Sequence, residues 1–596
     1  MGSNLSCRRN KPAVQIDSSM KEYEIGHEDN WEDNEVKEIK ITPEYSILVY
    51  LRDNLFYAFG SKCPHKGAPL INGTIVDKTV KCALHGSEFD IESGLCEDYP
   101  AYEGIPTFQI VNVLGRLKVL MKEPGVYSIS RPLGKIFSHQ RVAVAIGSGA
   151  SAVAFAQSLR EGRWEGRILL ISKDNFLPYD KTRLSETVNL SAENLKLKDA
   201  DWFQHLGIEL RLNTIVHRVD MVKRKLYVDG SPVPVPYTKL FIGTGSRGRL
   251  PTSRLVPGIN LKNIYTISDI HEAQRVYDVS KGKTVVIEGS GFIAMELVST
   301  MKKHAKMIYI VTRQKRPFQT VLGETVGKAL QRHIMTDVKN VEFFTFDEIR
   351  SITGNDKGEV KMVKTLKKRE INCDVVVYAI GSVPNSELFS AADKRGIISK
   401  TKHIVVNEFC ETNVTDVYAG GDVALVPLDC AVTGTATIAH WNFASYTGKI
   451  AAARILHVNE SFGDHYDESI IFGDIYDNLK FCVLYRRERK ILACATVNAD
   501  PIAARVSFNI GDHFQWEPGV YPKIITDTFP ELPILGEEFF GFKLDRETCI
   551  TLYDSQSTTE EVVRRGNRQF DTLQYKDTEF PLGLAEDKQM NFVFML

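Results

Sequence analysis

The chain has 596 residues, 43% hydrophobic and 25% charged, which is too long for one hydrophobic core and typical of a multidomain globular protein. A formal net charge of −1 gives no overall field to attract nucleic acid, and none is predicted as a partner. No run approaches the roughly 20 apolar residues of a membrane-spanning helix. The 10 cysteines are scattered without a CxxC pair, which favours a reducing compartment.

Residues 1–30 are predicted to form an N-terminal tail. It opens with MGSNLSC, in which Gly2 and Ser6 match the N-myristoylation pattern and Cys7 offers a second acylation point. One acyl chain alone anchors only marginally, and a polar leader without lipid is the alternative. The tail lacks the Arg-rich amphipathic pattern of a mitochondrial leader. We therefore expect a cytoplasmic chain with peripheral membrane contact through N-myristoyl Gly2.

Two cysteine–histidine pairs follow, in CPHKGAPL and CALHGSEF. They are Cys63-x-His65 and Cys82-x-x-His85, with 16 residues between His65 and Cys82. Glycines and prolines mark both stretches as loops, and short β-rich runs flank them. Two loops of a small β-domain would bring two thiolates and two imidazoles together. Zinc accepts this donor set, and so does a [2Fe–2S] centre with two cysteines on one iron and two histidines on the other.

The pattern C-x-H-x16-C-x-x-H, with a glycine closing each loop, resembles a Rieske domain over about residues 31–125. The resemblance implies a [2Fe–2S] cluster held by Cys63, His65, Cys82 and His85. A zinc site or loops without a ligand remain the alternatives. A linker is expected over 126–138.

Beyond the linker the pattern changes to alternating strands and helices. RVAVAIGSGASAVAFAQSLR reads as a strand, a glycine turn and a helix, with Gly147, Ser148, Gly149 and Ala150 at the turn. Such a turn lets backbone N–H groups and the helix N-terminus approach a pyrophosphate. The frame repeats in KTVVIEGSGFIAMELVST, at Gly289 and Gly291. Two turns predict two dinucleotide sites.

The strands after the two turns end differently. RILLIS is followed by Asp174, which is predicted to accept a hydrogen bond from a ribose hydroxyl. MIYIVT is followed by Arg313, and no acid stands there. A basic group at this place accommodates a 2′-phosphate, so NADPH is at least as plausible a substrate as NADH. The alternative is that Arg313 is a solvated surface residue.

Further strand-and-turn stretches complete a family resemblance. VVVYAIGSVPN carries Gly381, and TNVTDVYAGGDVA carries Asp422. With the two turns, these resemble the two-dinucleotide flavoprotein reductases, and fusion to a Rieske domain resembles the apoptosis-inducing-factor-like flavoproteins. The resemblance implies a multidomain α+β chain in which two Rossmann-like α/β units follow the all-β Rieske domain, and in which Asp422 binds FAD. The expected order is an FAD-binding domain (139–265 and 385–450), an NAD(P)-binding domain inserted at 266–384, a reduced C-terminal α+β interface domain (451–510) and an unassigned extension (511–596).

The residues expected beside the flavin depart from the family pattern. In PYDKTRLSE, Lys181 stands for an arginine and Glu186 for a lysine whose usual carboxylate partner maps to Glu296. Two facing carboxylates would raise the pKa of one of them, and they are the predicted catalytic pair. A further arginine that contacts FAD becomes Ser268. His440 and Trp441 match the positions of rings beside the flavin.

These features predict an NAD(P)H-dependent FAD oxidoreductase that passes electrons to its own Rieske cluster and on to an unknown acceptor. The family resemblance adds a pro-apoptotic role and mitochondrial association, which no residue pattern demonstrates. Because the departures gather at the flavin, the alternative is a cofactor-bearing signalling or scaffold protein with little turnover. A zinc-stabilised binding module is the third hypothesis.

Overall fold

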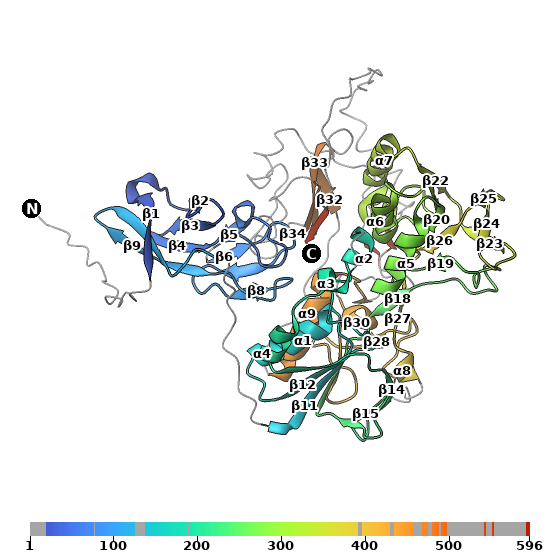
Figure 1. Cartoon of the computed structure of the whole chain (residues 1–596), viewed down its shortest axis with the longest axis horizontal. Helices are drawn as coiled ribbons and strands as arrows, with labels where there is room; N and C mark the ends of the chain where they lie inside the picture. Colours follow the sequence, from blue (N-terminus) through green and yellow to red (C-terminus); the bar gives the residue numbers. More distant parts are fainter. Residues whose placement is uncertain are drawn as a thin grey trace, which may run out of the picture. The chain divides into compact units, whose positions relative to one another are not determined.

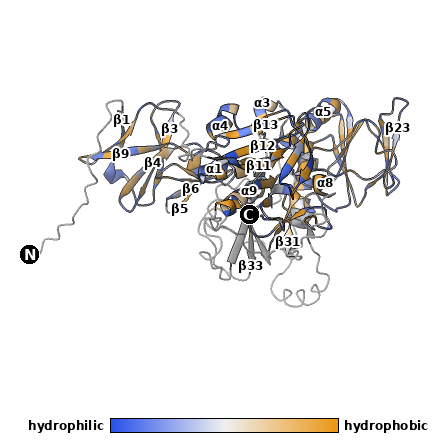
Figure 2. Cartoon of the chain, turned by 90° about the horizontal axis from the view of Figure 1, so that it is seen from below, coloured by the Kyte–Doolittle hydropathy of each residue, from blue (hydrophilic) through white to orange (hydrophobic). Residues whose placement is uncertain are grey.

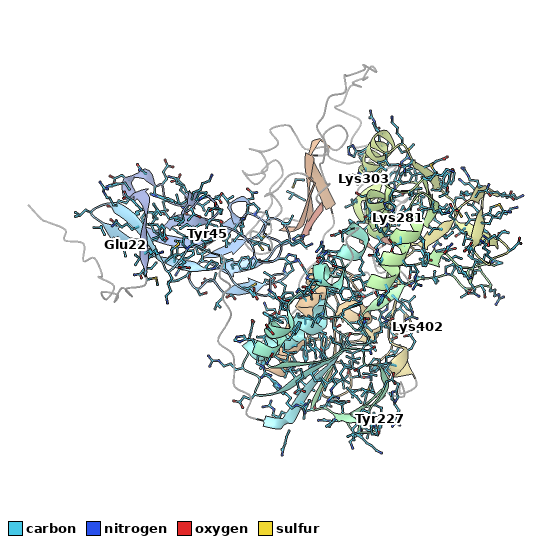
Figure 3. All side chains as sticks on the ribbon, in the orientation of Figure 1. Glu22, Tyr45, Tyr227, Lys281, Lys303 and Lys402 are labelled. Carbon is cyan, nitrogen blue, oxygen red and sulfur yellow. The ribbon has the colours of Figure 1, made fainter. Side chains whose placement is uncertain are left out.

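The computed structural model describes two compact units, Met1–Arg131 and Pro132–Leu596 (Figure 1). Within them the described residues are 20–76, 78–125, 138–187, 191–390, 396–428 and 434–456, with the strand segments 468–474, 480–487, 490–497, 542–543, 551–552 and 592–595. The Gly2 prediction lies outside this range. In Figure 3, Glu22 and Tyr45 mark the first unit, and Tyr227 and Lys281 mark the second.

The first unit is all-β. A six-stranded antiparallel sheet has the order β1-β10-β9-β4-β3-β2, and a four-stranded sheet has the order β5-β6-β7-β8. Strand β3 is buried on both faces, since Leu48 packs into one apolar cluster and Val49 into another. The strands are β1 (Lys21–His27), β2 (Val36–Lys40), β3 (Ser46–Arg52), β4 (Leu55–Gly60), β5 (Thr74–Val76), β6 (Thr79–Lys81), β7 (Glu88–Asp90), β8 (Cys96–Asp98), β9 (Thr107–Val113) and β10 (Arg116–Met121), with short 3-10 turns at Glu28–Asn30 and Leu70–Asn72.

The boundary expected at residue 31 falls too late for this sheet. Lys21 pairs with Met121, so β1 is an integral edge strand and the domain includes residues from 21 onward. The stretch KEYEIGH has too few apolar residues to predict a strand by itself. Its pairing with β10 shows that it belongs to the sheet.

The first dinucleotide unit is built on a five-stranded parallel sheet of order β13-β12-β11-β17-β29. Apolar runs form its central strands, and every residue of 142–146 and 168–171 is buried, as in a parallel sheet covered on both faces. Figure 2 colours the chain by hydropathy. Helix α9 packs against α1, and a Cβ at Gly448 would lie 2.1 Å from the Ser151 carbonyl, so glycine permits the close approach. The elements are β11 (Ser138–Ile146), α1 (Ala150–Glu161), β12 (Gly166–Ile171), α2 (Arg183–Glu186), α3 (Ala192–Leu195), α4 (Ala200–His205), β13 (Ile208–Arg211), β14 (Val216–Asp220), β15 (Lys225–Val228), β16 (Val235–Pro236), β17 (Lys239–Ile242), α8 (Glu387–Ser390), β28 (Ile404–Val405), β29 (Val417–Ala419), the 3-10 turn η4 (Gly421–Val423), β30 (Ala424–Pro427), β31 (Thr435–Ala436) and α9 (Trp441–Ile455).

The second dinucleotide unit repeats this plan with the parallel order β19-β26-β20-β21-β22. A three-stranded antiparallel meander, β23-β24-β25, packs its apolar residues against the sheet. A ribbon of β18 (Ser246–Gly248) and β27 (Ser382–Pro384) pairs at the chain crossings between the two dinucleotide units. The elements are β19 (Ile264–Tyr265), α5 (Ile270–Ser280), β20 (Thr284–Glu288), α6 (Phe292–Met301), β21 (Met307–Thr312), α7 (Gln319–Asp337), β22 (Val341–Thr345), β23 (Ile349–Gly354), β24 (Val360–Thr365), β25 (Glu370–Asn372) and β26 (Val375–Tyr378).

The last sheet has the order β32-β33-β34-β37. Its strands are β32 (Glu468–Asp474), β33 (Lys480–Arg487), β34 (Lys490–Val497) and β37 (Phe592–Met595), and a separate hairpin joins β35 (Phe542–Lys543) to β36 (Thr551–Leu552). The segment 511–596, unassigned from sequence, therefore supplies an edge strand, with Met595 opposite Cys494.

The predicted fold class is confirmed. Among the helices that the structure describes, none combines the length and apolar character needed to span a membrane.

Candidate metal centre and dinucleotide sites

The two cysteine–histidine stretches form matching turns. In the first, the Cys63 N–H donates to the Ala68 carbonyl (2.9 Å) and the Gly67 N–H donates back to the Cys63 carbonyl (2.9 Å). In the second, the Cys82 N–H donates to the Ser87 carbonyl (2.8 Å), and the Gly86 N–H donates to the Cys82 carbonyl (3.1 Å). Both glycines have positive φ, +70° and +81°, which L side chains rarely adopt.

These turns place the four predicted ligands in two pairs. The Cys63 and Cys82 thiols hydrogen-bond to each other and are buried, with 2% and 1% of their surface exposed. The His65 and His85 rings meet edge to face, with centroids 4.8 Å apart, and are half-buried. The sulfurs therefore form the inner side of the centre and the imidazoles its outer side.

The pairing discriminates between the two metal hypotheses. Tetrahedral zinc needs four donors around one point, whereas a Rieske centre needs a sulfur pair on one iron and a nitrogen pair on the other. The Cys82 thiol and burial raise the pKa of Cys63, so a nearby cation is needed to ionise this thiol at neutral pH. The residues fit a [2Fe–2S] group.

Ser87 is a neighbour of this centre that the sequence analysis did not single out. Its hydroxyl is fully buried, accepts the Ala101 N–H (2.9 Å) and donates to the Cys63 sulfur. A donor to a cluster sulfur stabilises added negative charge, so Ser87 would tune the potential of the centre. The signal was available, since Ser87 lies inside CALHGSEF.

The first glycine turn forms an open cradle at the start of α1. Gly147 has φ +115°, and a Cβ there would lie 2.1 Å from the Gly243 carbonyl, so only glycine fits. Gly149 caps α1 without a side-chain hydrogen bond, and a Cβ there would meet nothing within 4 Å. The backbone at Gly149, where α1 begins, thus borders open space, as a bound pyrophosphate requires. The Ser148 hydroxyl bonds Ser172 at the end of β12 (2.8 Å).

The Asp422 motif folds back against this turn. Gly421 has φ +69°, and a Cβ there would lie 2.8 Å from the Ser151 hydroxyl at the first turn of α1. Asp422 accepts a hydrogen bond from Ser246 (2.8 Å), a partner that sequence reasoning missed. Burial raises the pKa of Asp422, while Ser246 and the positive charge of Lys181 oppose that rise. Lys181, itself exposed, therefore lies within electrostatic reach of Asp422.

The start of α9 carries the two predicted ring residues. His440 is the N-cap of this helix, and burial lowers its pKa. The Trp441 indole N–H is buried, and no described residue accepts its hydrogen bond. A buried donor without an acceptor fits a polar group that binds at this position.

A cavity of about 290 Å³ lies at the end of β12. Asp174 lines it, as expected for the residue that contacts a ribose, together with Asp269 and His271 from the start of α5. Its remaining lining residues are Lys173, Asn175, Phe176, Tyr179, Asn213 and Ile270. The adenosine half of a dinucleotide is of the size and polarity that this cavity accepts.

The second turn repeats the geometry of the first. Gly289 has φ +124°, and a Cβ there would lie 2.2 Å from the Ala379 carbonyl. Gly291 caps α6, and a Cβ there would meet nothing within 4 Å. Gly381, with φ +97°, lies just beyond β26, at the same edge of the sheet. These residues fit a second dinucleotide.

At the end of β21, Arg313 is exposed and its Nε lies 3.7 Å from Glu348. Thr312, the last residue of the strand, bonds Ser290 through its hydroxyl (2.8 Å). Strand β21 therefore ends in a threonine and not in an acid, and the carboxylate paired with Arg313 belongs to Glu348, which precedes β23.

The predicted acid pair spans the two dinucleotide units. Glu296, on α6, accepts a hydrogen bond from Ser185 on α2 (2.5 Å), and Thr300 bonds the Ser185 carbonyl (2.6 Å). Burial and the neighbouring Glu186 raise the pKa of Glu296 to about 7, although the hydrogen bond from Ser185 acts to lower it. Ser268, where the resemblance implied an arginine, accepts the Gly248 N–H (2.9 Å). The Glu296 carboxyl can thus hold or release a proton near neutral pH.

Comparison with known proteins agrees with this geometry. A family model described as pyridine nucleotide-disulphide oxidoreductase matches residues 141–448. The chain belongs to this family. A Rieske [2Fe-2S] domain model matches residues 21–109 in addition.

Relatives and solved structures match different shares of the chain. Apoptosis-inducing factor 3 of Homo sapiens is 29% identical over 527 residues, covering 82% of this chain and 83% of that protein. The ferredoxin–NAD(+) reductase component of the biphenyl dioxygenase system of Paraburkholderia xenovorans is 29% identical over 291 residues, covering 48% of this chain and 67% of that one. The solved putidaredoxin reductase–putidaredoxin covalent complex shares the fold, with TM-score 0.57 and 22% identity over 64% of this chain and 95% of that one.

The family and the site together identify the general chemistry. The chain is an NAD(P)H oxidoreductase whose cofactors are FAD and a [2Fe–2S] cluster, as predicted. The resemblance to apoptosis-inducing-factor-like flavoproteins is confirmed.

Proposed function

We propose that this flavoprotein passes electrons from NAD(P)H through its flavin to its own Rieske centre, and from there to an acceptor still to be identified. The observation that carries the proposal is one chain with two open glycine cradles and a paired cysteine–histidine centre. When bound, FAD supplies a carrier that takes two electrons together and releases them singly, as a [2Fe–2S] cluster needs. Joining both parts in one chain raises their effective concentration.

The chain's own residues have separate tasks in this proposal. Gly149 and Gly291 leave helix N-termini open to the two pyrophosphates, and Asp422 holds the polar chain of the flavin cofactor. His65 and His85 lie on the outer side of the metal centre, where an acceptor has access.

Glu296 and Glu186 are the proposed catalytic pair. Hydride transfer changes the proton balance beside the flavin, and a carboxyl with a pKa of about 7 can take or give that proton. Glu186 acts by keeping the pKa of Glu296 high, where a lysine would lower it.

An anaerobic titration tests the proposal. NADPH or NADH is added to the purified holoprotein, flavin bleaching is followed by absorbance, and cluster reduction by electron paramagnetic resonance. We expect both signals in the wild type. Cys63→Ser should lose the cluster signal and keep flavin bleaching, while Cys96→Ser, outside the ligand set, should keep both. A flavin that bleaches beside a cluster that stays oxidised would contradict transfer within the chain.

A second candidate is a cofactor-bearing signalling or scaffold protein with little turnover. The observation that favours it is that Glu186 and Ser268 are not basic, at two positions where the family resemblance implied a lysine and an arginine. In that case neither coenzyme would bleach the flavin within minutes, although flavin and iron would be present in stoichiometric amounts.

The proposal extends to location and cellular role. The Gly2 pattern supports N-myristoylation, a cytoplasmic location and peripheral membrane contact, which Gly2→Ala should abolish in a fractionation assay. The name of the similar protein apoptosis-inducing factor 3 supports a pro-apoptotic role, and mitochondrial association is proposed from the family resemblance of the sequence alone. Imaging of the tagged full chain and viability of cells that express it would test these two points.

A further inference from the structure

Four charged residues gather beside the second glycine turn. They are Glu288, Arg313, Glu348 and Arg350, which we name the Glu348 cluster. Glu348 binds both arginines: its Oε2 lies 3.7 Å from the Arg313 Nε, and its Oε1 pairs with Arg350. Arg313 follows β21, whereas Arg350 comes from the meander strand β23, so tertiary packing brings the two guanidinium groups to one carboxylate.

The acidic side chains of the cluster are more buried than the basic ones. The Glu348 side chain is 19% exposed, and those of Arg350 and Arg313 are 50% and 73% exposed. Behind them Glu288 is buried and accepts the Ile349 N–H. The two guanidinium groups are therefore exposed to solvent, while the Glu348 carboxylate that they share is half-buried.

The cluster lies where a dinucleotide places its adenosine ribose. Glu288 immediately precedes Gly289 of the cradle, and Arg313 follows the strand whose end approaches the ribose. The residue that ends β21 is not the acid that would accept a ribose 2′-hydroxyl. Thr312 stands there instead, buried and bonded to Ser290.

Buried acids do not cancel this positive charge at neutral pH. Burial raises the pKa of Glu288 to about 7, so a share of this carboxyl is neutral there. One carboxylate, that of Glu348, then pairs with two guanidinium groups. The cluster has positive charge left over for an anion at its exposed side.

We propose that Arg313 and Arg350 clamp the 2′-phosphate of NADPH, and that Glu348 holds the two guanidinium groups together until the phosphate replaces it. The inference rests on the proposed use of NAD(P)H and names the coenzyme. Guanidinium groups bind phosphate through paired, charge-assisted hydrogen bonds, which a dianion strengthens. The ribose hydroxyl of NADH offers no such anion to the arginines.

Nucleotide binding to the holoprotein tests the clamp without any electron transfer. The probes are adenosine 2′,5′-bisphosphate and adenosine 5′-monophosphate, which differ only in the 2′-phosphate, and affinities are measured by calorimetry. We expect the bisphosphate to bind wild type about 10- to 100-fold more tightly, as one or two charge-assisted bonds imply. Arg313→Gln and Arg350→Gln should each bring that ratio toward one.

Two further variants sharpen the test. Glu348→Gln removes the carboxylate that competes with the phosphate and should increase the ratio. Lys364→Gln removes a positive charge from an exposed ion pair on the same meander and should leave it unchanged. Retained flavin absorbance verifies folding of each variant.

Two results would overturn the clamp. One is equal affinity of the wild type for the two probes, regardless of the affinity ratio measured for Glu348→Gln. The other is a preference that survives both arginine substitutions. Either result, combined with flavin bleaching by NADH, would leave the electron-transfer proposal intact while removing the clamp.

Discussion

In the wild type, ionisation of the buried Glu288 should lower the free energy of unfolding of the second dinucleotide unit as pH rises. The substitution Glu288→Gln should remove this pH dependence. Glu288 is 7% exposed, and burial raises the pKa of its carboxyl from 4.5 to about 7. The folded state therefore favours the protonated form more than the unfolded state does. Between those two pH values the folded chain holds a proton that the unfolded chain has released, so stability falls as pH rises.

The magnitude follows from the two pKa values. Each pH unit between 4.5 and about 7 corresponds to about 1.4 kcal/mol, so the ionised carboxylate lowers the free energy of unfolding by about 3 kcal/mol at pH 8. Glutamine is uncharged at every pH and keeps an oxygen for the Ile349 N–H. The variant and the wild type should thus be similar at pH 4.5 and diverge progressively above it.

Urea unfolding of the holoprotein at pH 5, 6, 7 and 8 measures this difference, with protection of β20 amides from hydrogen exchange as a local readout. Glu342→Gln, which removes an exposed carboxylate from β22 of the same sheet, is the matched control and should follow the wild type. A gap between Glu288→Gln and wild type that does not widen from pH 5 to pH 8 would refute the reasoning.

Three other predictions follow from the sites. Ser87→Ala removes a hydroxyl donor to the Cys63 sulfur and should lower the cluster potential by about 60–130 mV, since a hydrogen bond to a charged group is worth roughly 1.5–3 kcal/mol; an unchanged potentiometric midpoint would contradict it. Glu186→Lys replaces a charge that raises the pKa of Glu296, so the inflection in the rate of flavin reduction should move from about pH 7 to lower pH, and Glu296→Gln should abolish it. Gly147→Ala drives a Cβ to 2.1 Å from a backbone carbonyl and should yield unstable protein, whereas Gly149→Ala has open space and should fold yet bind FAD weakly. Flavin content and melting temperature separate these two effects, and a stable, flavin-replete Gly147→Ala would count against the cradle.

The sequence by itself determined the parts whose residues are neighbours along the chain. The cysteine–histidine turns close within six residues, from Cys63 to Ala68 and from Cys82 to Ser87, so their spacing predicts the loops directly. The glycine turns are equally local, because a strand, a tight turn and a helix N-terminus follow one another without interruption. Glu288 ends the apolar run TVVIE, but the sequence analysis did not single it out.

Only the tertiary structure decided which distant residues meet. It placed Ser246 on Asp422, brought Arg350 and Arg313 to one carboxylate, and paired β37 with β34 across a long stretch of chain. Such contacts depend on strand register and on which face of a sheet a loop returns to, and neither is set by local spacing. Burial is likewise a property of the assembled core, which is why the raised pKa of Glu288 follows from the fold and not from the residue order.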